Sequence, residues 1–246
     1  MFVPLYDENP LKNIRFQYVT VALIAINIIV YLASNLADER VAMSFALYPF
    51  ELFKQGLTGR PLTPPSDGLS IREGYTLFTY MFMHGNLLHI VGNMLFLWVF
   101  GDNVEDAVGH LRYLFFYIAC GLFAGVVHSW MNPQSMTPLI GASGAVAGVV
   151  AAYLLLYPRI HVWVLFLRIV PLHLTAAVAL GGWVLMQVVM AFLPQTGPVA
   201  WWAHVGGICM GAALILVLRL PGVGLFQKAT EPPLPKPDPP RPAGTS

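Results

Sequence analysis

Residues 113–158 read YLFFYIACGLFAGVVHSWMNPQSMTPLIGASGAVAGVVAAYLLLYP, a stretch without a single Asp, Glu, Lys or Arg. A helix needs about 20 apolar residues to cross roughly 30 Å of hydrocarbon, so this stretch is long enough for two crossings. Its middle, HSWMNPQSMTP at 128–138, carries two prolines and several polar residues, which is typical of a turn between helices. We therefore predict one membrane-spanning helix on each side of this turn.

Three more stretches without charged residues flank this one, at 16–37, 74–101 and 169–218. The last is again long enough for two helices and is divided by Pro194-Gln-Thr-Gly-Pro198. The sequence thus predicts an all-α membrane protein with six transmembrane helices and a long first outer loop. The expected spans are 17–36, 86–107, 113–130, 142–157, 172–193 and 199–219.

These spans form one expected membrane domain at residues 1–220. The residues from 221 to 246 contain eight prolines and few large apolar side chains, so we expect a disordered, proline-rich cytoplasmic tail there.

The overall composition agrees with a chain embedded in a lipid bilayer. Hydrophobic residues make up 57% of the chain and charged residues 10%, whereas soluble domains contain about 25% charged residues. The net charge of +1 argues against binding to nucleic acid, which requires a basic surface. The two cysteines, Cys120 and Cys209, both lie in apolar runs and cannot form a disulfide framework.

The distribution of Lys and Arg predicts the orientation. If both termini lie inside, the inner segments carry nine of these residues, and the two short outer loops carry none. The positive-inside rule therefore predicts an N-in/C-in, multi-pass protein of the cell membrane, and the six-span plan suits a bacterial inner membrane. The second, fourth and sixth spans then all run from the outer to the inner side.

Four polar side chains fall at the outer ends of these three spans. His89 and Asn93 begin the second span, Ser143 begins the fourth and His204 begins the sixth. At 1.5 Å of rise per residue, they lie within about 10 Å of the outer helix ends. Polar groups at membrane depth are functional candidates, because lipid offers them no hydrogen-bonding partners.

Glycines at helical spacing predict that the fourth and sixth spans pack closely. Gly144 precedes another glycine by four residues, and Gly207 and Gly211 share a helix face with His204. Such a contact brings Ser143 within reach of His204, and a neighbouring imidazole can take the proton of a serine hydroxyl. No Asp or Glu occurs between Asp106 and Glu231, so we expect a Ser-His dyad whose imidazole is oriented either by packing or by a neutral partner.

An attacking serine also needs donors for the developing oxyanion. His89 and Asn93, four residues apart on one helix face, could provide them with the backbone N–H of Ser143. A packed, structural histidine is the alternative interpretation of His89.

These motifs resemble those of the rhomboid intramembrane serine proteases. The resemblance covers about residues 73–211 and consists of four ordered motifs. They are His84-Gly-Asn-Leu-Leu-His89-Ile-Val-Gly-Asn93, then Gly101, Glu105 and Gly109, then Gly141-Ala-Ser143-Gly144, and finally Ala203-His204 with Gly207 and Gly211.

The resemblance implies Ser143 as nucleophile, His204 as general base and acid, and His89 and Asn93 as oxyanion donors. It also implies that transmembrane segments of other proteins are the substrates, cleaved near their outer ends. Gly141, Gly144, Gly207, Gly211, His84 and Glu105 would have supporting roles, with Glu105 bonding backbone at the inner helix ends.

The chain departs from the family pattern at two places. Tyr75 and Thr76 stand where many members have Trp-Arg, and Ala147 stands where some have an aromatic residue against the histidine.

Two other classes of protein remain as alternatives: a catalytically silent rhomboid-like scaffold or quality-control protein, and a small transporter. The sequence predicts no cofactor and no metal site, since it lacks His-Glu-x2-His and any carboxylate at the depth of the candidate histidines.

Overall fold

The computed structural model of the chain describes residues 2–55, 69, 71–166, 169–194, 197 and 199–227. Part of the predicted long loop, part of the turn at 194–198 and the predicted tail beyond residue 227 lie outside the described residues. The first residues of that predicted tail, 221–227, pack against the bundle: Phe226 and Gln227 donate backbone hydrogen bonds to Leu155 and Leu156 at 2.9 and 2.7 Å.

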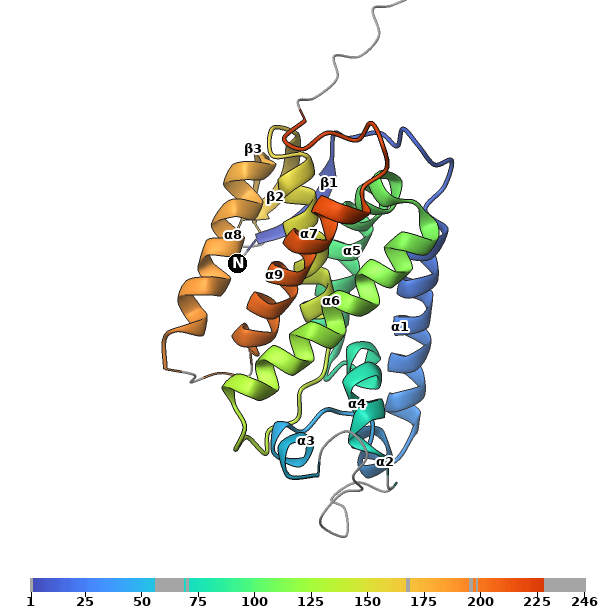
Figure 1. The fold of residues 1–246 in the computed structure, drawn as a ribbon, viewed down its shortest axis with the longest axis vertical. Helices are drawn as coiled ribbons and strands as arrows, with labels where there is room; N and C mark the ends of the chain where they lie inside the picture. The colour runs from blue at the N-terminus through green and yellow to red at the C-terminus, as the bar shows by residue number, and fades with distance from the viewer. Residues whose placement is uncertain are drawn as a thin grey trace, which may run out of the picture.

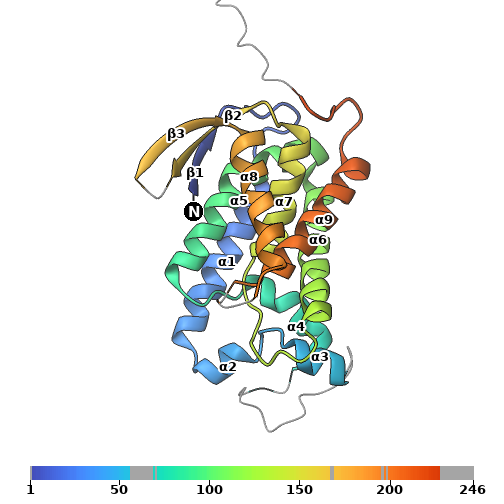
Figure 2. The ribbon, with the colours of Figure 1, turned by 90° about the vertical axis from the view of Figure 1, so that its left-hand side faces the viewer.

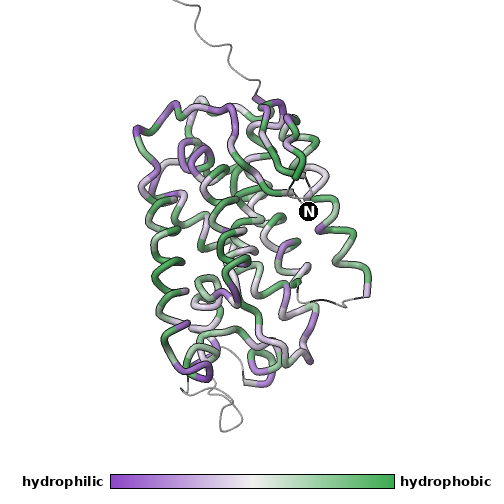
Figure 3. Tube along the Cα trace, turned by 180° about the vertical axis from the view of Figure 1, so that it is seen from behind, coloured by the Kyte–Doolittle hydropathy of each residue, from purple (hydrophilic) through white to green (hydrophobic). Residues whose placement is uncertain are grey.

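Apolar helices in the described part of the chain form a bundle (Figure 1; Figure 2). They are α1 (Tyr18–Leu36), α5 (Leu87–Val108), α6 (His110–Met131), α7 (Ser143–Leu156), α8 (Ala176–Ala191) and α9 (Trp201–Leu218). Four are long and apolar enough to cross a membrane, while α7 and α8 are shorter apolar helices. Hydrophobic residues run along the middle of the bundle and hydrophilic residues gather at its two ends (Figure 3). The chain is a multi-pass membrane protein.

The short helix α7 occupies the centre of this bundle. It contacts α5, α6, α8 and α9, and its residues from Gly144 to Tyr153 are all buried. Glycine, alanine and valine dominate this run, and such small residues let neighbouring helices approach closely. Because its sides are covered by protein, the start of α7 can hold a polar residue away from lipid.

The long first loop covers one end of the bundle, which we call the loop end. It contains α2 (Glu39–Met43), α3 (Pro49–Gln55), α4 (Glu73–Thr79) and the 3-10 helix η1 (Tyr80–Phe82). The N–H of Gly141 donates to the carbonyl of Tyr80 at 2.9 Å, which ties η1 to the residues just before α7.

A three-stranded antiparallel sheet lies at the opposite end, which we call the sheet end (Figure 2). The strands β1 (Phe2–Asp7), β2 (His161–Phe166) and β3 (Val170–Thr175) pair in the order β1-β2-β3. The protein is mostly helical, as the all-α prediction expected, but that prediction did not include this sheet. The predicted fifth span, 172–193, also began too early, because residues 172–175 pair with β2 and α8 starts only at Ala176.

Helices α7 and α9 meet backbone to backbone. A Cβ on Gly207 would overlap the carbonyl group of Gly144, and a Cβ on Gly211 would overlap Gly148. Glycine is required at these positions because the opposing atoms belong to the main chain and cannot turn away. The predicted contact between the fourth and sixth helices is present.

We predict that Gly211→Ala lowers the free energy of unfolding by about 1–3 kcal/mol, the usual cost of inserting a carbon into a filled contact. Gly182→Ala in α8 is the matched control, because a Cβ there meets nothing within 4 Å. Thermal unfolding in detergent compares the two variants. Equal melting temperatures would show that the close contact between α7 and α9 does not limit stability.

The sheet is joined to the bundle through a carboxyl group. The hydroxyl of Tyr153 in α7 donates a hydrogen bond to the carboxyl of Asp7 in β1. Burial raises the pKa of Asp7 to about 7, although the hydrogen bond from Tyr153 opposes the change. Between about pH 4 and pH 7, Asp7 is therefore protonated in the folded protein but ionised in the unfolded chain, where its pKa has the ordinary value near 4.

It follows that Asp7 makes its full contribution to stability below about pH 4 and loses it as the pH rises to about 7. Asp7→Asn keeps an oxygen for Tyr153 but does not titrate. We predict that the melting temperature of the wild type falls between pH 4.5 and 7.5 relative to that of Asp7→Asn. Parallel curves for the two proteins would contradict this prediction.

Candidate active site

The two residues predicted as a dyad lie in direct contact at the loop end of the bundle. Ser143 is the first residue of α7, and His204 lies in the first turn of α9. Nε2 of His204 is 2.9 Å from Oγ of Ser143. Ser143 is half-buried, whereas His204 is buried. The serine hydroxyl can thus donate its proton to the imidazole, as general-base activation requires.

The neutral partner of His204 is Gln187 of α8. Oε1 of Gln187 lies 2.7 Å from Nδ1 of His204, and both side chains are buried. An amide oxygen only accepts, so Nδ1 carries the proton and Nε2 presents a lone pair to Ser143. Sequence reasoning missed Gln187. The signal was there, because it is the one Gln, Asn, Asp or Glu in the predicted span 172–193.

Two tryptophan rings flank the same imidazole. The ring centres of Trp183 in α8 and Trp201 in α9 lie 6.2 and 6.0 Å from that of His204. Ala147, which stands where some rhomboids have an aromatic residue, is buried in α7. The aromatic surroundings of His204 therefore come from α8 and α9 instead of α7.

The predicted oxyanion donors line the segment that leads into Ser143. A Cβ on Gly141 would lie 2.6 Å from Nε2 of His89 and 3.8 Å from Nδ2 of Asn93. Gly141 also has a φ of +123°, which side chains with a Cβ rarely adopt. Glycine at this position lets His89 and Asn93 approach the turn before the serine, and their role as oxyanion donors stays a prediction.

His84 holds the Asn93 amide in place. Its Nδ1 donates to the carbonyl of Phe82 at 3.3 Å, and its Nε2 accepts from Nδ2 of Asn93 at 3.1 Å. The N–H of Ala142 also points to this Nε2, at 3.5 Å. An amide nitrogen has two hydrogens, so Asn93 keeps one free for a further acceptor.

The other predicted supporting residue, Glu105, lies far from this site at the sheet end of α5. Its carboxylate accepts hydrogen bonds from the backbone N–H groups of Val19 and Thr20 at 3.0 and 2.8 Å, and it contacts His110. The N–H groups of Val19 and Thr20 lie in the first turn of α1 and therefore have no partner within the helix itself. Glu105 thus bonds backbone at a helix end, as predicted, and takes no part in the candidate active site.

The family comparison agrees with the positions of these motifs. A family model described as the Rhomboid domain matches residues 72–221, which is more than half of the chain. The chain belongs to the rhomboid family. All four motifs, from His84 to Gly211, lie within the matched residues.

Several curated rhomboid relatives are also similar to this chain. The Rhomboid protease GluP of Bacillus subtilis is 29% identical over 63% of this chain and 28% of its own length. The RHOMBOID-like protein 5 of Arabidopsis thaliana is 29% identical over 60% of this chain and 45% of its own. The RHOMBOID-like protein 1 of the same plant is 24% identical over 92% of this chain. The chain spans about 28–59% of the length of these relatives.

We predict that Gln187→Leu slows the reaction of Ser143 with a fluorophosphonate probe about tenfold or more, because the imidazole loses its orienting acceptor. Gln187→Glu restores an acceptor oxygen and is expected to retain most of the reactivity. Met186→Leu, the adjacent position on α8, is the control for packing.

The maximal rate of labelling is measured separately from probe affinity, because a positioning role lowers the rate and leaves the affinity unchanged. Equal rates for Gln187→Leu and Met186→Leu would contradict the assigned role of Gln187.

Proposed function

We propose that the chain is an intramembrane serine endopeptidase that cleaves transmembrane segments of membrane proteins through a Ser143-His204 dyad. The observation that carries the proposal is the continuous series of hydrogen bonds from Ser143 to His204 to Gln187. It sets the proton positions that a serine nucleophile needs. Membership of the rhomboid family supports the same chemistry.

The reaction begins when Nε2 of His204 takes the proton of Ser143 and Oγ attacks a substrate carbonyl carbon. The negative charge moves to the carbonyl oxygen, where the free hydrogen of Asn93, the His89 ring and the N–H of Ser143 stabilise it. His204 then gives its proton to the leaving amine, and the peptide bond breaks to leave an acyl-enzyme. His204 then takes a proton from water, and the water oxygen attacks the acyl carbon. The bond from that carbon to Oγ breaks, the acid product leaves, and His204 returns the proton to Oγ of Ser143.

We propose six membrane crossings: the four longer helices, together with the shorter α7 and α8. The two termini then lie inside, and the loop end with the active site faces outside, as the positions of Lys and Arg favour. Because α7 and α8 are short, the Ser143 end of the bundle would lie below the outer membrane surface, where water and substrate can both reach it.

Substrates would reach the dyad sideways, between α5 and α8. Phe96 of α5 and Trp183 of α8 pack across this boundary with ring centres 5.7 Å apart, so they must separate to admit a helix. The substrate must also unwind near the scissile bond, because a helix engages its carbonyls in its own hydrogen bonds.

A catalytically silent rhomboid-like scaffold is the second candidate, and it would bind membrane proteins without cleaving them. The presence of Ser143 and His204 at 2.9 Å favours the enzyme, since a scaffold has no need of an activated hydroxyl. The two functions differ in whether Ser143 reacts.

We predict that wild-type protein reacts with a fluorophosphonate probe and cleaves some members of a panel of tagged single-span proteins co-expressed with it. Ser143→Ala and His204→Ala should each lower cleavage by at least about 10³-fold. Ser34→Ala is the matched control, because that hydroxyl bonds the carbonyl of Val30 within α1.

Melting temperatures show whether each variant is folded. Cleavage that persists in folded Ser143→Ala would contradict the dyad. A folded wild type that neither reacts nor cleaves, yet captures the panel proteins intact, would favour the scaffold.

A further inference from the structure

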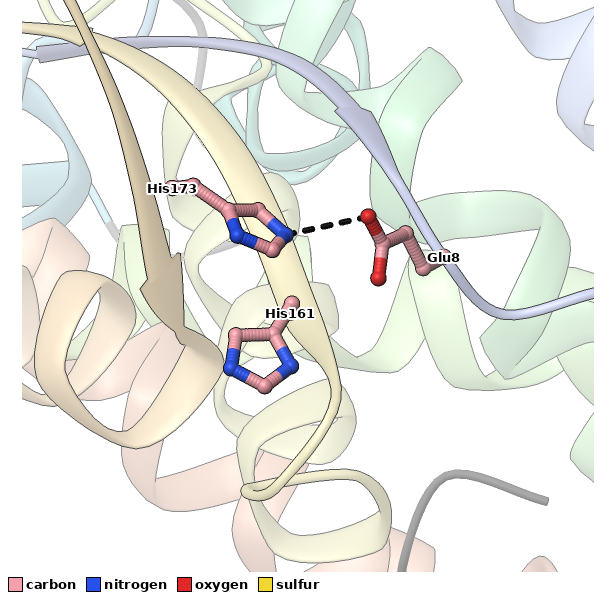
Figure 4. Close-up of side chains that lie close together, drawn as sticks. All are labelled: Glu8, His161 and His173. Atoms are coloured by element: carbon pink, nitrogen blue, oxygen red, sulfur yellow. Dashed lines mark hydrogen bonds and ion pairs between the residues drawn. The ribbon is translucent and has the colours of Figure 1, made fainter. Parts of the chain in front are cut away.

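The sheet end carries a second cluster of reactive side chains. The outer face of the sheet presents His161 of β2 and His173 of β3, and Glu8 follows β1 directly (Figure 4). These residues lie at the opposite end of the molecule from Ser143. Neither the rhomboid motifs nor the proposed reaction uses them.

The register of the strands explains why the three side chains meet. Trp163 of β2 is the direct partner of His173, and His161 lies two residues before Trp163, so both histidines point to the same face. The N–H of Glu8 donates to the carbonyl of His161 at 3.1 Å, which places Glu8 beside it. The other face of β2 packs on the bundle through Val162 and Val164, which are buried.

The three side chains already contact one another. Nε2 of His173 is 3.0 Å from Oε1 of Glu8, and the rings of His161 and His173 are stacked with centres 4.6 Å apart. One ligand atom from each residue lies within 4.8 Å of the other two. The side chains of His173 and Glu8 are 38% and 46% exposed, so an ion can reach them from water.

We propose that Glu8, His161 and His173 bind a divalent transition-metal ion, with Zn²⁺ as the best match. Two imidazoles and one carboxylate are a ligand set that Zn²⁺ uses, with water as the fourth ligand. Ca²⁺ and Mg²⁺ prefer sites made of oxygen atoms, which this cluster does not provide.

The present geometry requires only local movement to bind the ion. The ligand atoms around a tetrahedral Zn²⁺ ion are about 3.4 Å apart. In the structure the ligand atoms of Glu8, His161 and His173 lie within 4.8 Å of one another, so they must move closer together. The exposed Glu8 and His173 side chains can turn toward a common point while the paired backbone of β2 and β3 stays fixed. The rings of His161 and His173 must also leave their stacked arrangement to direct their lone pairs at the ion.

A bound ion would connect distant parts of the chain. Glu8 and His173 are separated by 165 residues, and β3 continues directly into α8 at Ala176. The ion would fix β1 to the strands that precede α8. Stabilisation of this end of the molecule is therefore the direct physical consequence of binding.

The test is titration of purified full-length protein, without a polyhistidine tag, with Zn²⁺ against a chromophoric chelator. We expect one Zn²⁺ per chain for the wild type. His161→Gln, His173→Gln and Glu8→Gln should each weaken Zn²⁺ binding at least about tenfold. Loss of a residue that only orients a metal ligand already weakens binding by about that factor, and loss of a ligand itself should weaken it at least as much. Zn²⁺ should also raise the melting temperature of the wild type but not of these variants.

His110→Gln is the matched control, because His110 also contacts a glutamate at the sheet end yet lies outside the cluster. It is expected to bind Zn²⁺ as the wild type does. Melting temperatures without metal show that each variant is folded. The proposal is overturned if the wild type binds no more Zn²⁺ than folded His173→Gln, or if His110→Gln loses as much affinity as the cluster variants.

Discussion

The contact between the backbones of α7 and α9 is the constraint on which the candidate active site depends. Gly207 and Gly211 lie so close to Gly144 and Gly148 that no side chain fits between them. Ser143 and His204 are one and three residues from this contact, so the helix separation sets the distance between Oγ and Nε2. In lipid there is little hydrophobic force between helices, and close packing of small residues provides much of the attraction.

The sequence predicted those features that the bilayer itself imposes. Gaps between charged residues located α1, α5, α6, α7 and α9 to within three residues at each end. The same rule placed Ser143 and His204, because polar residues tolerated at membrane depth are few and their depth follows from their position along a span. The hydropathy pattern was therefore sufficient to predict the positions of these helices and to single out Ser143 and His204.

Features that depend on pairing between distant residues could not be read in this way. The sheet joins residues 2–7 to residues 161–175, and no local pattern connects two segments so far apart. The cluster of Glu8, His161 and His173 was invisible for the same reason. Gln187 could be singled out as the one such polar residue in its predicted span, but its contact with His204 could not, because that contact depends on how α8 is rotated toward α9.

The choice of glutamine as the partner of His204 fits the depth of the site. Gln187 is buried in a membrane helix, and burying a hydrogen-bonded amide costs less than burying an ionised carboxylate. The amide oxygen still fixes which nitrogen carries the proton. However, it offers no negative charge to stabilise the imidazolium that would form in the proposed reaction. In the proposed reaction, stabilisation of the substrate oxyanion by Asn93 and His89 would then carry more weight, and the hydrogen bond that Asn93 donates to His84 fixes the orientation of one of these donors.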